Sequence, residues 1–144
     1  MTNKELCERY PFLIPWKVRE GRIAIDDWNY ERTLLDDMEP GWRKAFGIQM
    51  CEELRAALIA ANALDRYQVG DIKEKWGELR WYSWGGTNST YEIEDKYLML
   101  SRKICGKCGK PATHIGTAWI YPYCGECATP DAKEILQKEY GREM

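Results

Sequence analysis

Four cysteines towards the end of the sequence are spaced as metal ligands. Cys105 and Cys108 form one C-x-x-C pair, Cys124 and Cys127 form a second, and 15 residues separate the two pairs. This spacing is typical of zinc sites, because a two-residue gap lets both sulfurs of a tight turn face one ion. The sequence therefore predicts one structural Zn²⁺ held by these four thiolates.

Other chemistries fit these cysteines less well. Disulfides form in oxidising compartments, and the N-terminal sequence lacks the basic flank and apolar core of a signal peptide, so we expect a reducing, cytoplasmic setting. Four thiolates also fill a tetrahedral ion, which leaves no position for substrate or water. His114, the single histidine, lies between the two pairs and is an alternative to one cysteine as ligand. We expect it to be a loop residue instead.

Lysines crowd the first cysteine pair. Lys103, Lys107 and Lys110 lie within the pair or beside it. Their charges would offset the net negative charge that four thiolates leave on a zinc ion. As an alternative, Lys107 and Lys110 are candidate residues for binding a phosphate or a partner.

The residues after the second cysteine pair are of the types found at helix starts. Thr129 suits an N-cap, Pro130 the first helical position and Asp131 the first turn. We therefore expect residues 104–144 to form a zinc-knuckle module that ends in a helix. Residues 104–140 in this arrangement resemble a treble-clef or zinc-ribbon-like fold.

Two amphipathic helices are expected to position this module. Phe46, Met50, Leu54, Leu58 and Ala61 recur at helical spacing and predict a main helix over about 40–62.

The second helix is expected over about 89–103. It begins with a Ser89-x-x-Glu92 capping box and runs directly into the first cysteine pair. Without a flexible linker between them, the zinc module should be docked on the rest of the chain.

A β-hairpin is expected between these helices, over about 67–84. Successive side chains of a strand point to opposite faces, and in its second arm, "LRWYSW", both faces carry bulky residues. One face can fill the core, whereas the face with Arg80, Tyr82 and Trp84 must be covered or presented to a partner. These three residues are therefore candidate binding residues.

The segment before residue 40 is harder to interpret. Pro11 and Pro15 interrupt any long helix, and "KVREGRIAI" suggests a strand pair that turns at Gly21. Together with the elements above, residues 1–103 are predicted to form one α+β domain. The fold class expected is α+β, a small helix-plus-β-hairpin domain with a docked C-terminal zinc module held by four cysteines.

Composition and charge limit the functions open to the chain. It has 144 residues, 44% of them hydrophobic and 31% charged, with a net charge of −2. Residues 66–119 form the one basic part, with nine Lys and Arg against six Asp and Glu. Nucleic-acid binders usually carry a strong basic face, so this excess gives such a role weak support. No run of 18 apolar residues occurs, so we expect a soluble protein without a membrane partner.

Four longer segments of the sequence, called phrases below, resemble those of a known family. They are "RYPFLIP", "LDDMEPGWRKAFG", "IKEKWGELRWYSWG" and "CGKCGKPA…WIYPYCGECA". With these phrases the chain resembles a group of uncharacterised small zinc-binding proteins encoded by phages and prophages of gut bacteria. The resemblance implies a phage setting, in which small accessory proteins often act by binding host components, and it implies no particular activity.

These observations favour a binding protein over an enzyme. The chain has no phosphate-binding loop, no H-E-x-x-H and no G-x-S-x-G motif. The predicted function is a non-enzymatic, zinc-stabilised protein that binds and modulates a host protein, with a counter-defence role. The alternative is a binder of a nucleotide or nucleic acid, in which Tyr82 and Trp84 stack on bases and Arg80 meets phosphate. A second alternative is an enzyme with an unrecognised carboxylate site.

Overall fold

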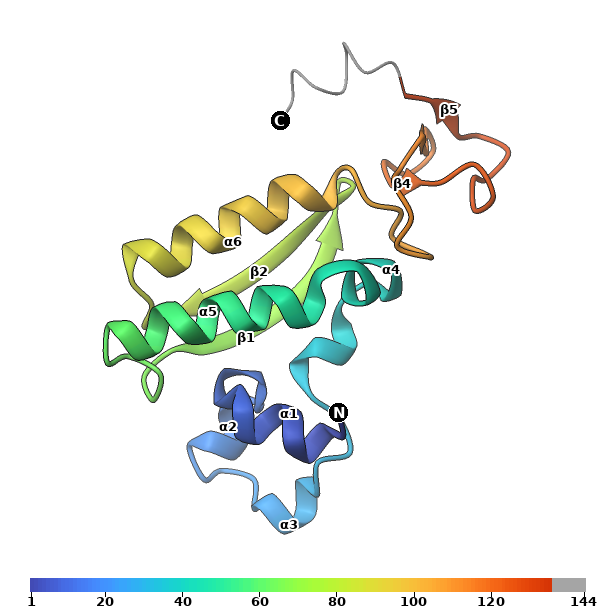
Figure 1. Cartoon of the computed structure of the whole chain (residues 1–144). Helices are drawn as coiled ribbons and strands as arrows, with labels where there is room; N and C mark the ends of the chain where they lie inside the picture. The colour runs from blue at the N-terminus through green and yellow to red at the C-terminus, as the bar shows by residue number, and fades with distance from the viewer. Residues whose placement is uncertain (136–144) are drawn as a thin grey trace.

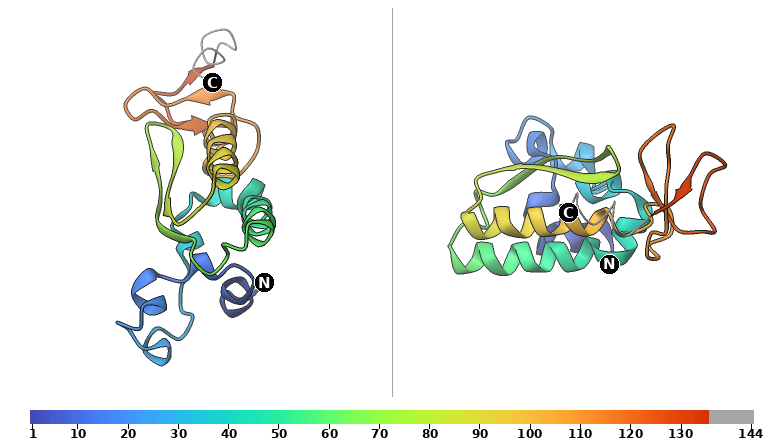
Figure 2. Two further views of the ribbon diagram at one scale, coloured as in Figure 1. Left: turned by 90° about the vertical axis from the view of Figure 1, so that its left-hand side faces the viewer. Right: turned by 90° about the horizontal axis from the view of Figure 1, so that it is seen from above.

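Two long helices packed on one side of a β-hairpin form the frame of the molecule. The computed structural model describes residues 1–135. In it, α5 (Ile48–Ala60) and α6 (Asn88–Ser101) lie side by side over the hairpin of β1 (Gln68–Lys75) and β2 (Glu78–Trp84) (Figures 1 and 2). The predicted α+β class is thus confirmed. Within residues 1–135, every helix is too short or too polar to cross a lipid bilayer.

The main helix follows the prediction closely. It starts at α4 (Pro40–Trp42), passes through one π-helical segment, η3 (Arg43–Gly47), and continues as α5. Pro40 suits the first position because its missing N–H would have had no helical partner. Four members of the predicted apolar stripe are buried, and they are Phe46, Met50, Leu54 and Leu58. The fifth, Ala61, is exposed at the C-cap of α5.

The hairpin confirms the predicted alternation. Its strands pair antiparallel, with Ile72 opposite Trp81 on the buried side and Lys73 opposite Arg80 on the other side. The two turn residues, Trp76 and Gly77, have φ of 56° and 78°. This left-handed pair matches the right-handed twist of the strands, although the first position normally favours Asn, Asp or Gly.

The core lies between the inner side of the hairpin, the two long helices and the N-terminal segment. Aromatic side chains fill much of it, and their polar tips find partners: the Trp81 indole donates to the Tyr67 hydroxyl at 2.9 Å. The largest fully buried side chains are Trp42, Tyr10, Tyr67, Tyr97, Phe12, Leu6, Leu13, Leu35, Met50, Leu54, Leu58 and Ile72.

Helix α6 begins one residue earlier than predicted and with a different cap. The Thr87 side chain accepts from the Thr90 amide, and the Thr90 hydroxyl accepts from the Thr87 amide. The predicted box of Ser89 and Glu92 is therefore wrong. Thr90 is fully buried beneath the helix start, so tertiary packing selected the cap between two locally similar sequences.

The N-terminal segment consists of short helical turns, and the predicted strand pair at "KVREGRIAI" is wrong. Pro15 precedes a helix here, and Gly21 does form the predicted turn, with φ of 79°. The Arg19 guanidinium donates to the carbonyls of Tyr67 and Asp65, which fixes this segment against the start of β1. The elements are α1 (Asn3–Arg9), η1 (Pro11–Leu13), α2 (Trp16–Arg19), α3 (Ile25–Trp28) and η2 (Leu34–Asp37).

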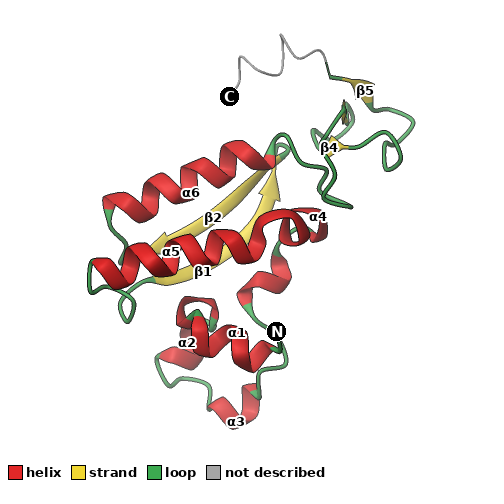
Figure 3. Ribbon diagram, viewed as in Figure 1, coloured by secondary structure: helices red, strands yellow, loops and turns green. Residues whose placement is uncertain are grey.

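The C-terminal module is a small antiparallel sheet beyond the end of α6 (Figure 3). Its strand order is β4 (Pro122–Tyr123), β3 (His114–Ile115), β5 (Lys133–Glu134). The predicted helix start at Thr129 is wrong, because residues 133–134 pair with β3 instead. The rest of that predicted helix lies outside the described residues.

Candidate metal centre

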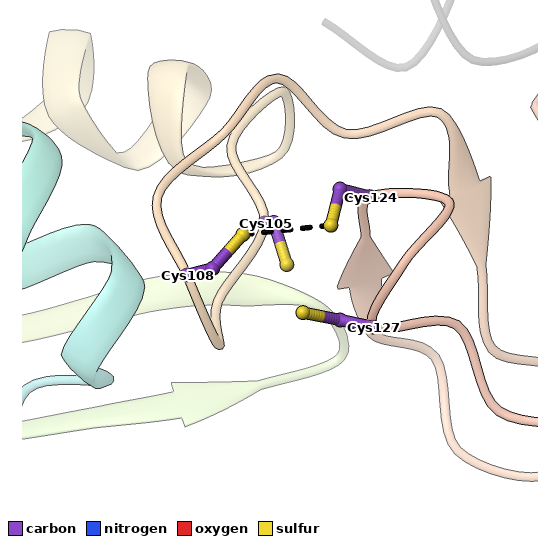
Figure 4. A group of neighbouring side chains, drawn as sticks. All are labelled: Cys105, Cys108, Cys124 and Cys127. Carbon is purple, nitrogen blue, oxygen red and sulfur yellow. Dashed lines mark hydrogen bonds between the residues drawn. The ribbon is translucent and has the colours of Figure 1, made fainter.

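The four predicted cysteines meet at one point of the C-terminal module. Their sulfurs all lie within 4.8 Å of one another, with Cys108 Sγ and Cys124 Sγ 3.4 Å apart. Figure 4 shows the four side chains gathered between the two knuckles. A tetrahedral ion with metal–sulfur bonds of about 2.3 Å needs sulfurs roughly 3.8 Å apart. All six cysteines of the chain are free thiols, so these four can hold one metal ion.

Backbone hydrogen bonds shape the first knuckle around its sulfurs. The Cys105 amide donates to the Lys110 carbonyl at 2.7 Å, and the Gly109 amide donates to the Cys105 carbonyl at 3.0 Å. Gly109 has φ of 86°, which a residue with a side chain adopts only under strain. The Gly106 amide then bonds to the Pro122 carbonyl and joins this knuckle to the strand before the second one.

The close contact of the thiols shifts the pKa values of Cys124 and Cys127 in opposite directions. Burial by itself would raise the pKa of Cys124, but the Cys127 amide and the neighbouring thiols outweigh it and lower this pKa to about 7. Hydrogen bonding to Cys124, followed by burial, raises the pKa of Cys127 to about 12. Thiols this close do not all ionise unless a cation lies among them, because neighbouring thiolates repel one another. This repulsion favours binding of a metal ion at the centre of the group.

His114 lies outside the donor group. It lies in β3, so the expectation of a loop residue is wrong, and its ring Nδ1 is 2.8 Å from the Thr113 hydroxyl. Among residues 1–135, the side chains grouped closely enough to hold a metal ion are those of the four cysteines. The site is therefore a closed four-thiol centre, in agreement with the sequence-based expectation.

The two candidate lysines have partners inside the module. The Lys107 amine lies 5.0 Å from the centre of the Tyr121 ring. The Lys110 amine pairs with the Glu126 carboxylate at 3.1 Å and so bridges the two knuckles. These contacts fit the local, charge-offsetting role, while binding of a phosphate or a partner by either lysine stays a prediction.

The first knuckle packs directly on the start of the main helix. The Gly41 amide donates to the Gly106 carbonyl at 2.8 Å, and the Trp42 indole donates to the Ile104 carbonyl at 2.9 Å. A β-carbon at Gly41 would lie 2.1 Å from the Cys105 carbonyl oxygen. Only glycine allows this approach, so the metal module is fixed to the helix by close backbone contact.

A second contact joins the module to the tip of the hairpin. The indoles of Trp76 and Trp119 stack, with centroids 6.0 Å apart and planes 10° apart. The Glu74 carboxylate accepts from the Trp119 indole and from the Gly77 amide, both at 2.9 Å. We call Glu74, Trp76, Gly77 and Trp119 the hairpin clasp. The sequence did not predict the hairpin clasp, because its two halves lie far apart in the chain. The available signal was the bulky Trp76 beside Gly77 at the expected turn of the hairpin.

The three candidate residues of the second arm, Arg80, Tyr82 and Trp84, alternate along β2 with the buried Leu79 and Trp81 and so share the opposite side of the strand. We call them the outer face. Tyr82 is 48% and Trp84 is 47% exposed. The Arg80 guanidinium is instead half-buried and paired at 2.7 Å with Glu78. The structure therefore leaves the two aromatic residues accessible and gives the arginine an internal partner.

One enclosed carboxylate bears on the enzyme alternative. Glu94 accepts hydrogen bonds from the hydroxyls of Tyr67 and Ser83, both at 2.7 Å. Burial raises the pKa of Glu94, and these two hydrogen bonds oppose the rise. The bonds tie α6 to the hairpin, which is a structural task.

Comparison of the chain with protein-family models, with curated proteins and with solved structures finds no match.

Proposed function

We propose that this chain is a non-enzymatic, zinc-stabilised binding protein that contacts a partner protein through the outer face. The observation that carries the proposal is the exposure of Tyr82 and Trp84, each close to one half, on a strand whose opposite side is buried. Large aromatic residues dominate the energetics of protein interfaces because they bury much apolar surface and also offer a polar atom.

Zinc is the ion that the donor set favours. Thiolates prefer soft metal ions, and four of them in a tetrahedral arrangement are typical of structural zinc. Cys105, Cys108, Cys124 and Cys127 would hold it. A bound zinc ion would supply folding free energy and no reaction chemistry, since the four cysteines complete its coordination.

Both aromatic rings of the outer face lie against neighbouring residues of the hairpin. A β-carbon at Gly70 would lie 2.7 Å from the Trp84 ring, so the indole occupies the space that a side chain would otherwise fill. The Lys73 amine lies 5.5 Å from the Tyr82 ring centre. Rings that are already ordered lose little conformational entropy on binding, which favours their use as anchors.

Charge favours a protein partner over a long nucleic acid. The chain has a net charge of −2, and the Arg80 charge is paired with Glu78. The family resemblance adds a phage setting, and we propose a host protein as the partner, with a counter-defence role.

A nucleotide or single-stranded nucleic acid is the second candidate. Its support is the Lys73 amine beside the Tyr82 ring, which combines a stacking surface with a cation. Titration with nucleotides and short oligonucleotides by calorimetry tests it separately from protein binding.

Substitutions on the outer face test the main proposal. Partners captured from a bacterial host lysate would be identified, purified and titrated against the wild type and against Tyr82→Ala and Trp84→Ala. We expect each substitution to weaken binding by about 1–3 kcal/mol and to leave metal content unchanged. Gly70→Ala should weaken binding as well, because its β-carbon displaces the Trp84 ring.

Tyr91→Ala is the matched control, since Tyr91 is 44% exposed and belongs to α6 rather than to the hairpin. It should bind as the wild type does. If the outer-face variants keep full affinity for every partner, or if they unfold as core truncations do, the outer face is not the binding surface.

A further inference from the structure

The hairpin clasp leaves two indole rings open to solvent beside a carboxylate. Trp76 is 57% and Trp119 is 55% exposed, although the two rings stack on one another. The Glu74 carboxylate accepts hydrogen bonds from the Trp119 indole and from the Gly77 amide. A carboxylate has about four acceptor positions, so these bonds leave capacity for a further donor.

We propose that the hairpin clasp binds a cationic side chain, an arginine or lysine, of the protein partner. The faces of an indole carry negative electrostatic potential and attract guanidinium and ammonium groups, with tryptophan the strongest of the aromatic residues. The Glu74 carboxylate adds a full negative charge beside the rings. A nucleic acid would bring its phosphates towards this same carboxylate, so the clasp favours a basic protein segment.

No lysine or arginine within residues 1–135 fills this site. Among the described residues, lysines or arginines lie over several other aromatic rings, and none lies over Trp76 or Trp119. Lys75, the neighbour in sequence, lies opposite Glu78 in the backbone register of the hairpin. Alternation along the strand directs it to the side opposite Glu74. The rings that hold an internal cation are those of Tyr10, Trp16, Tyr82, Tyr97 and Tyr121.

Both halves of the clasp are held in place by hydrogen bonds. On the hairpin side, the Gly77 amide bonds to Glu74 across the turn. On the module side, the Asp131 carboxylate accepts from the amides of Thr117 and Ala118, at 2.8 Å and 2.9 Å, and fixes the loop before Trp119. A cation would therefore meet a site that needs little ordering.

The test uses the full, zinc-loaded chain and a short peptide with two arginines, with its citrulline counterpart as the uncharged control. The readout is the indole N–H resonances in NMR spectra, assigned with Trp76→Phe and Trp119→Phe. We expect the arginine peptide to shift these two resonances and the citrulline peptide to leave them in place. Shifts of equal size with both peptides, or none with either, would overturn the proposal.

Glu74→Gln isolates the role of charge, because its amide oxygen can still accept from Trp119. It should weaken binding of the arginine peptide by about twofold to fivefold, as loss of an exposed charge pair does, and leave the free Trp119 resonance nearly unchanged. Glu92→Gln, which removes the same charge from an exposed site on α6, should have no effect. Equal affinity of Glu74→Gln and wild type, or tighter binding of a short oligothymidylate than of the arginine peptide, would rule the site out.

The inference rests on the proposed function only in taking a protein as the partner, and the two can fail separately. If Tyr82→Ala loses the partner while Glu74→Gln keeps it at full affinity, the outer face is the binding surface and the clasp is structural. If Glu74→Gln alone loses the partner, the clasp is the site and the outer-face proposal fails.

Discussion

Trp76 and Trp119 stack nearly in parallel across the boundary between the hairpin and the metal module. Trp76 does so from a backbone conformation, φ of 56°, that costs a residue with a β-carbon roughly 1–2 kcal/mol. Offset stacking of aromatic rings contributes about 0.5–1.5 kcal/mol beyond the burial of their area. The stack therefore offsets much of the strain in the turn, and the two parts of the chain stabilise one another.

A double-mutant cycle will measure this coupling. We expect Trp76→Ala and Trp119→Ala to show an interaction free energy of about 0.5–1.5 kcal/mol in urea unfolding. Trp84→Ala combined with Trp119→Ala is the control pair and should be additive. Additivity in both cycles would mean that the stack contributes nothing to stability.

Metal content will test the four-thiol centre. Elemental analysis of the purified protein should find one zinc per chain, and Cys108→Ser should lose it. Removal of the ion by a chelator should first abolish amide protection in residues 104–135, because structural zinc contributes about 10–16 kcal/mol of apparent binding free energy in small modules. His114→Ala should keep the full zinc content. Loss of zinc in that variant would place the histidine among the ligands.

Gly41→Ala should separate the metal module from the main helix. Its β-carbon would lie 2.1 Å from the Cys105 carbonyl oxygen, a backbone atom that cannot rotate away. We expect lower thermal stability, by a few kcal/mol as for other overpacked sites, and weaker zinc retention in competition with a chelator. Gly125→Ala is the matched control, since the nearest atom to its β-carbon would be 3.8 Å away. Equal zinc retention in the two variants would show that docking does not support the centre.

Acid should weaken one surface contact in a defined range of pH. Hydrogen bonds from Arg9 and then from Tyr10 lower the pKa of Glu52 from 4.5 to about 2. Because the folded value is the lower one, the stabilisation is complete above pH 4.5 and is lost as the pH falls towards 2. The pair is well exposed, so Glu52→Gln should cost only about 0.2–1 kcal/mol at neutral pH.

The measurement is the free energy of unfolding of wild type and Glu52→Gln as a function of pH. The difference between them should stay constant above pH 4.5 and shrink below it. Glu8→Gln, an exposed substitution on the same short helix as Arg9, serves as the control. A difference that persists unchanged down to pH 2 would contradict the assignment.

The sequence predicted those elements whose pattern of buried residues repeats at a regular spacing. Phe46, Met50, Leu54 and Leu58 repeat once per helical turn and all face the core, so the main helix was predictable. The site of the four cysteines was equally predictable, because their spacing alone indicates that the four sulfurs meet at one point.

Elements that depend on distant partners were not predictable in this way. Thr129, Pro130 and Asp131 have the types of a helix start, yet the Asp131 carboxylate binds the amides of Thr117 and Ala118 instead. The same residue types serve a helix cap and a loop anchor, and only the tertiary fold separates the two uses. The short turns before residue 40 are also too brief to show a period.

The hydrogen bond from the Trp42 indole to the Ile104 carbonyl spans 62 residues. This separation affects the order in which parts of the chain can fold during synthesis. Trp42 is fully buried in the core, but its polar atom has no native acceptor until the chain has been extended through the hairpin and α6. A buried donor without an acceptor costs about 1–3 kcal/mol. On the ribosome, the packing of the main helix is therefore completed only after the first cysteine knuckle has been synthesised.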